Sequence, residues 1–154
     1  MTSNEIQLIR ETFPLVARRA DLAALLFYKR LFDLDPSLRQ LFRPDIEEQG
    51  RKLMQMLGAA VQLLEKPDAL VPVLEGLGRR HVGYGVRDEH YDTVGEALLW
   101  TLHSALGDFF TPNAREAWAS LYGFVAATMK RAALGELHLT PAPSLPHQTE
   151  AAAR

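Results

Sequence analysis

Apolar residues recur every three or four positions along nearly the whole chain, which is the period of an amphipathic α-helix. The alternation of apolar and polar residues that is typical of β-strands is absent. The pattern therefore predicts an all-α protein of seven or eight helices, several of them short. A regular four-helix bundle would use fewer helices of more even length.

Residue types that favour helix N-termini mark the start of each predicted helix. Thr2 and Glu5 form the T-x-x-E pattern of a capping box. Asp21 precedes a helix that is expected to bury Leu22 and Leu25. The other predicted starts are Asp35-Pro36, Asp45, Lys66-Pro67-Asp68, Asp88 and Thr111-Pro112.

The chain of 154 residues is long enough to build one core without disulfides or metals. Residues 1–136 are expected to form one helical domain. Residues 137–154 contain three prolines and an alanine run and have little to bury, so we expect a flexible tail there.

Composition narrows the functional classes. With 17 basic and 19 acidic residues spread along the chain, neither nucleic acid nor an anionic membrane is expected as the main partner. The absence of cysteine excludes disulfides, zinc-thiolate sites, iron–sulfur clusters and thiolate-ligated haem. Neither a signal-peptide pattern nor a membrane-length apolar run is present, so a cytoplasmic protein is expected.

His81 is predicted to lie on the apolar face of its helix, four residues after Leu77, seven after Leu74 and eight after Val73. Ligation is only one of the roles of histidine in proteins. Taken alone, the position therefore fits a buried neutral histidine better than a metal ligand.

Two other polar residues are predicted to face inward. Gln49 begins the apolar face of its helix, and Tyr28 lies three residues after Leu25 and three before Leu31. Taken alone, Gln49 fits a surface residue of a first turn and Tyr28 fits a core tyrosine. Together with His81, they give an imidazole and two neutral hydrogen-bonding groups among apolar segments, which suits a haem that binds a diatomic gas.

Other common site chemistries are not indicated. Glu47 and Glu48 are adjacent, so they do not share a helix face as a paired acid and base would. The glycines form neither a dinucleotide-binding nor a phosphate-binding motif. His90 is expected at a helix start and His103 as a packed histidine.

Several segments together resemble globins, over about residues 3–133. Within that family they resemble bacterial single-domain haemoglobins and the haem domains of flavohaemoglobins, and most of all a single-domain globin of a thermoacidophilic methanotroph. The segments that carry the resemblance are 26–32, 35–36, 41–42, 49–54, 78–81, 84–86, 90–99, 117–118 and 121–123.

This resemblance implies a globin fold, a three-on-three helical sandwich, that holds haem b. It implies His81 as the proximal iron ligand and Gln49, 32 residues earlier, as the distal residue. On the distal side, the Tyr28 hydroxyl is expected to donate a hydrogen bond to the bound gas, while Gln49 donates as well or orients Tyr28. Phe42 falls on the phenylalanine that packs against the haem. The remaining implied haem contacts are Leu53, Val86, Tyr91 and Val94.

Two departures from the flavohaemoglobin pattern stand out. Those proteins continue into flavin- and nicotinamide-binding domains, whereas this sequence ends soon after the globin-like part. Their proximal histidine is polarised by a tyrosine and a glutamate. Tyr91 matches the tyrosine, but the place of the glutamate falls near Ala132 or Ala133, and Glu136 lies about a turn later.

Four functions remain in order of preference. The first is reversible binding of O₂, with NO and CO as further ligands, by a monomer or weak homodimer. The second is an enzyme, a nitric oxide dioxygenase that forms nitrate with a separate reductase. A haem-based sensor ranks lower because such sensors carry an output domain. A helical protein without haem would leave the shared placement of Tyr28, Gln49 and His81 unexplained.

Five basic residues, Arg51, Lys52, Arg79, Arg80 and Arg87, are candidates to pair with the haem propionates, although each one singly fits a solvated surface.

Overall fold

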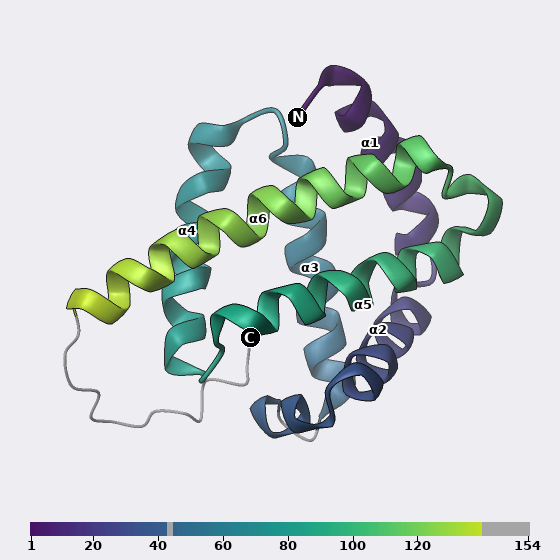
Figure 1. Ribbon diagram of the computed structural model, residues 1–154. Coiled ribbons are helices and arrows are strands. Elements are labelled where there is room, and N and C mark those ends of the chain that lie inside the picture. Colours follow the sequence, from purple (N-terminus) through teal and green to yellow (C-terminus); the bar gives the residue numbers. More distant parts are fainter. Residues whose placement is uncertain (43–44, 140–154) are drawn as a thin grey trace.

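A computed structural model of the protein describes residues 1–42 and 45–139, the last four of these as backbone only. All regular structure in this part of the chain is helical (Figure 1). The all-α prediction and the expected seven or eight helices are thus confirmed for the described residues. The elements are α1 (Ser3–Ala17), α2 (Ala20–Leu34), the 3₁₀ helix η1 (Pro36–Leu41), α3 (Ile46–Gln62), α4 (Pro67–Gly83), α5 (Asp88–Leu106), the 3₁₀ helix η2 (Gly107–Phe109) and α6 (Pro112–Leu139).

Most predicted helix starts are confirmed at the level of single hydrogen bonds. The Thr2 hydroxyl accepts from the Glu5 N–H at 3.1 Å, and the Glu5 carboxylate accepts from the Thr2 N–H at 3.0 Å. The Asp35 carboxylate caps η1 by accepting from the Ser37 N–H, and the Asp45 carboxylate caps α3 by accepting from the Glu48 N–H. The prediction for α2 is wrong by two residues, because the helix begins at Ala20 and Asp21 lies inside its first turn without capping it.

The buried side of α2 also differs from the prediction. Leu22 and Leu25 face solvent, with 48% and 55% of their surface exposed. Tyr28 is nevertheless buried, because it lies four residues after Ala24 and three before Leu31, both of which are buried. Small alanines on this face let a neighbouring helix approach closely, whereas leucines there would hold it away.

The helices pack in two crossing groups. In Figure 1, α5 and α6 run across the front of α3 and α4, while α1 lies at the upper right and α2 at the lower right. Helix α6 packs along α4 and also contacts α1 and α5, and α2 packs against α3 and α5. Two crossings depend on glycine: a Cβ at Gly50 would lie 2.7 Å from the Ala24 Cβ, and one at Gly78 would lie 2.4 Å from the Met129 carbonyl oxygen.

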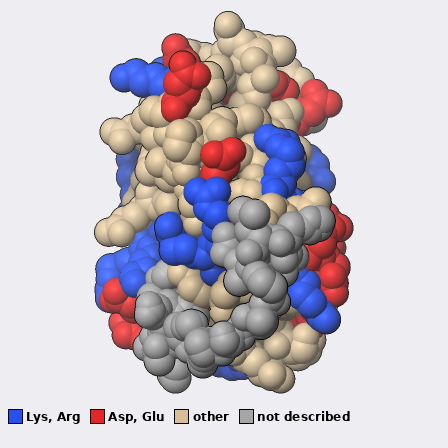
Figure 2. All heavy atoms as spheres, turned by 90° about the vertical axis from the view of Figure 1, so that its left-hand side faces the viewer, with Lys and Arg blue, Asp and Glu red and all other residues tan. Residues whose placement is uncertain are grey.

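Helix α6 extends to Leu139, past the domain boundary expected after residue 136. The rest of the predicted tail, 140–154, lies outside the described residues. None of the helices in the described ranges is long and apolar enough to cross a membrane. Figure 2 shows acidic and basic side chains interspersed over the face at the left of Figure 1.

Candidate functional site

A cavity of about 220 Å³ lies between the helices. Its walls come from every described α-helix except α1, together with η1 and the segment that joins α4 to α5. Most of the lining side chains are aliphatic or aromatic. The polar or partly polar ones are Gln49, His81, Tyr84, His90, Tyr91, Trp118 and Tyr122.

His81 lies in the last turn of α4 and lines this cavity together with Leu74 and Leu77. Val73, which was predicted on the same face, is 39% exposed and lies outside the lining. The His81 Nδ1 lies 2.8 Å from the Leu77 carbonyl oxygen. Because a carbonyl only accepts hydrogen bonds, Nδ1 carries the proton, and in the neutral ring the lone pair available for a metal is on Nε2.

Gln49 lies in the first turn of α3 and is 3% exposed. It lines the cavity, so the polar start of this helix faces inward as the pattern predicted. The close crossing of Gly50 and Ala24 brings α2 against this turn. As a result, the Tyr28 hydroxyl donates a hydrogen bond to the Gln49 backbone carbonyl at 3.3 Å.

Tyr28 itself does not line the cavity. Its ring packs in an aromatic cluster with Phe27, Phe32 and Phe42, with ring centroids 5.0, 6.0 and 5.4 Å away respectively. Phe42 lines the cavity and separates part of this cluster from it. Burial raises the pKa of the Tyr28 hydroxyl far above its ordinary value, so it stays protonated at neutral pH.

Tyr91, on α5, lines the cavity and is 7% exposed. Its hydroxyl is buried and has no hydrogen-bond partner among the described residues. Burial, with a smaller contribution from Asp88, raises its pKa to about 12. The Lys130 ammonium lies 5.6 Å from the centroid of the same ring. The side chain of Glu136 lies outside the described part of the chain.

Of the eight predicted site residues, the structure brings all but Tyr28 to the cavity wall. The seven cofactor-contact candidates that line it are Phe42, Gln49, Leu53, His81, Val86, Tyr91 and Val94. His90 also lines the cavity, although the sequence analysis predicted only that it lies at a helix start. The signal was its spacing, since it lies four residues before Val94 and eight before Leu98 on one face of α5.

Comparison with known proteins identifies the family of this chain. A family model described as Globin matches residues 25–129. The chain belongs to the globin family. A neuroglobin from Tetraodon nigroviridis is 32% identical over 145 residues, which cover 85% of this chain and 91% of the relative.

Other globin relatives are longer proteins. A flavohemoprotein from Bordetella parapertussis is 36% identical over 131 residues, which cover 82% of this chain. The matched residues span only 32% of the length of this relative.

Two solved structures share the globin fold. One is an engineered carbene transferase made from a Rhodothermus marinus protein named for nitric oxide dioxygenase activity. It has a TM-score of 0.81 and 25% identity, with 90% of this chain and 97% of that chain covered. The other is a hexacoordinated haem protein from a tardigrade, which at 18% identity and a TM-score of 0.80 shows the fold alone, over 87% of this chain and 96% of that one.

Haem is therefore the cofactor of this globin, and the residues of the cavity fit it. Haem needs an apolar slot, an axial ligand and room at its edge for two carboxylates. His81 lines this cavity with its ring held at Nδ1 by the Leu77 carbonyl, so it is the residue that would hold the haem iron, through Nε2. Among the described residues no cluster of three His, Cys, Asp or Glu side chains is suited to a bare metal ion, so a single imidazole is the ligand type at hand.

Proposed function

We propose that this globin binds O₂ reversibly at its haem, with His81 as the proximal ligand and Gln49 on the distal side. Haem supplies an iron with an open coordination position for a diatomic gas. The observation that carries the proposal is the His81 ring, fixed at Nδ1 by the Leu77 carbonyl 2.8 Å away and facing a mostly apolar cavity.

The distal residues support a role in gas retention. The Gln49 amide lines the cavity, is 3% exposed and would donate a hydrogen bond to a gas held there. The Tyr28 hydroxyl, bonded to the Gln49 carbonyl, supports the turn that carries this amide. Direct donation from Tyr28 to the gas, which the sequence suggested, would require its hydroxyl to turn away from that carbonyl. We therefore assign Tyr28 a positioning role.

The visible spectrum of the reduced protein, with and without CO and O₂, tests this proposal. We expect a five-coordinate ferrous spectrum that changes on addition of either gas and returns when the gas is removed. His81→Gly should lose this spectrum, and added imidazole should restore it by occupying the place of the missing ring. A spectrum in His81→Gly that matches wild type without imidazole would show that another residue binds the iron.

A second function, conversion of NO to nitrate, is favoured by the likeness to flavohemoproteins and to the Rhodothermus marinus protein. The reaction consumes one NO, one O₂ and one electron for each nitrate formed, so sustained turnover requires a reductase. Consumption of NO in the steady state with an added reductase supports the enzyme. A single stoichiometric reaction that no reductase can sustain supports the binding protein.

A further inference from the structure

His90 is a buried imidazole that the proposed gas chemistry does not use. It lies in the first turn of α5, is 7% exposed and lines the haem cavity. A histidine at this depth is expected to have hydrogen-bond partners for its ring nitrogens. Its partners therefore indicate what it does at the cavity.

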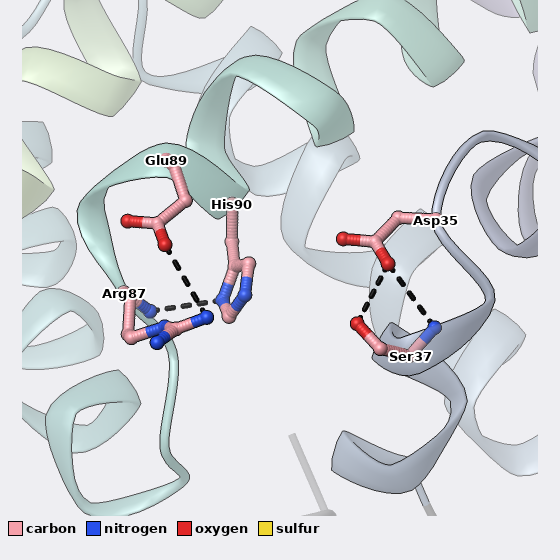
Figure 3. Close-up of polar contacts among 5 residues, drawn as sticks. All are labelled: Asp35, Ser37, Arg87, Glu89 and His90. Atoms are coloured by element: carbon pink, nitrogen blue, oxygen red, sulfur yellow. Dashed lines mark hydrogen bonds and ion pairs between the residues drawn. The ribbon is translucent and has the colours of Figure 1, made fainter.

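One of the two ring nitrogens has a fixed role. The Arg87 backbone N–H donates a hydrogen bond to the His90 Nδ1 at 2.9 Å (Figure 3). Because a backbone N–H can only donate, Nδ1 is the acceptor, and the proton of the neutral ring lies on Nε2. Among the described residues nothing accepts a hydrogen bond from Nε2. This nitrogen is not among the fully buried atoms that lack a partner, so it is accessible to a molecule from outside the protein.

The charged groups around His90 leave this donor for a molecule in the cavity. Figure 3 shows Arg87 and Glu89 on one side of the ring, joined by an ion pair of 3.3 Å, and Asp35 on the other. The Asp35 carboxylate accepts from the Ser37 hydroxyl at 2.6 Å and from the Ser37 N–H at 3.1 Å. The one carboxylate that faces His90 from η1 is therefore already hydrogen-bonded within its own turn.

Haem has two ionised groups at its edge, both propionate carboxylates, which require hydrogen-bond donors or positive charge from the protein. We propose that His90 donates a hydrogen bond from Nε2 to a haem propionate, so that the Arg87 N–H, the imidazole and the carboxylate form a chain. The exposed Arg87 guanidinium adds positive charge at the same edge. This inference depends on haem binding and not on which gas the haem carries.

The test compares two variants and two cofactors. His90→Gln keeps both an acceptor for the Arg87 N–H and an N–H donor. His90→Glu also keeps an acceptor for the Arg87 N–H, as in a capping box, but it replaces the donor by a negative charge. Each protein is loaded with haem or with haem dimethyl ester, whose edge carries no carboxylate. The rate of cofactor loss to an excess of a haem scavenger is followed by the visible absorption.

We expect His90→Glu to lose haem roughly ten- to hundredfold faster than wild type, the range for loss of a hydrogen bond to a charged group. His90→Gln should stay close to wild type. With the dimethyl ester, His90→Glu and wild type should differ by less than about threefold, since no charged acceptor remains. Equal acceleration with both cofactors would overturn the proposal, because a purely structural role at the start of α5 does not depend on the propionates. No acceleration with either cofactor would overturn it as well.

A measurement on the wild-type protein removes any dependence on how the variants fold. In the haem complex, the Nε2 proton of His90 should be visible by nitrogen-15 NMR and exchange slowly with water. In the dimethyl ester complex it should exchange faster. The same exchange rate in both complexes would contradict a hydrogen bond to a propionate.

Discussion

Replacing Gly78 with alanine tests whether the crossing of α4 and α6 sets the position of His81. A Cβ at Gly78 would lie 2.4 Å from the carbonyl oxygen of Met129, 2.8 Å from its Cα and 2.9 Å from its carbonyl carbon. All three atoms belong to the backbone of α6, so no side chain can turn aside to make room. The two helices must separate, and His81 lies three residues further along the displaced helix.

The expected cost follows from two opposing effects. Overpacking a well-packed core costs about 1–3 kcal/mol, and a clash with backbone belongs at the upper end of that range. Alanine is a better helix former than glycine by about 1 kcal/mol, which offsets part of the cost. We therefore expect the free energy of unfolding to fall by about 2 kcal/mol, which lowers the Tm by about 4–8 °C in a domain of this size.

Thermal unfolding followed by circular dichroism measures this change, and two other glycines supply controls. A Cβ at Gly123, on α6, meets nothing within 4 Å, and one at Gly76, on α4, meets only the flexible end of Arg80 at 3.5 Å. Both should tolerate alanine or gain stability, whereas Gly78→Ala should also release haem faster than wild type. A Gly78→Ala protein as stable as Gly123→Ala would refute the close crossing.

Three further changes have defined outcomes. The buried Trp118 indole N–H donates to the Thr12 hydroxyl at 2.9 Å. Thr12→Val removes this acceptor and should lower the free energy of unfolding, measured with denaturant, by about 1–3 kcal/mol. Thr12→Ser keeps the hydroxyl and should not lower it. Gln49→Leu should raise the O₂ dissociation rate in stopped flow roughly ten- to hundredfold, and Tyr28→Phe should raise it less; equal effects would assign Tyr28 a direct contact. Burial raises the pKa of Tyr91 from 10.0 to about 12, so its contribution to stability is present below pH 10 and is lost as the pH rises towards 12. The Tm of Tyr91→Phe should fall less than that of wild type over this range, and a parallel fall would contradict the raised pKa.

The helical part of the fold could be predicted because local rules decide it. The capping box of Thr2 and Glu5 and the acceptors Asp35 and Asp45 act within four residues of sequence. The buried face of α2 could not be predicted in this way. Alanine is only weakly hydrophobic, so it contributes little to an apolar pattern in the sequence. The face of α2 that carries Ala24 is nevertheless buried, because Gly50 lets α3 approach it.

In the site, too, the features set by spacing along one helix could be predicted, and those set by how helices cross could not. The spacing of Gln49 and His81 placed both at the cavity, since each begins or continues an apolar face. It did not show that the Tyr28 hydroxyl bonds to a backbone carbonyl of α3, because that contact depends on how two helices cross. His90 was not predicted at the cavity because a position at a helix start was enough to account for a histidine there. Its spacing to Val94 also indicated that it faces inward.

On the proposed proximal side, a hydrogen bond within α4 sets the state of the His81 ring. The His81 Nδ1 proton is accepted by a backbone carbonyl of its own helix, which is a neutral group. The Tyr91 hydroxyl has no acceptor among the described residues, and the nearby Lys130 adds positive charge. Acceptors of the proton on a ligating histidine raise its basicity, and a carboxylate does so more than a carbonyl. The bond to the Leu77 carbonyl therefore keeps the Nδ1 proton on the His81 ring and leaves the Nε2 lone pair for the haem iron that we propose it binds.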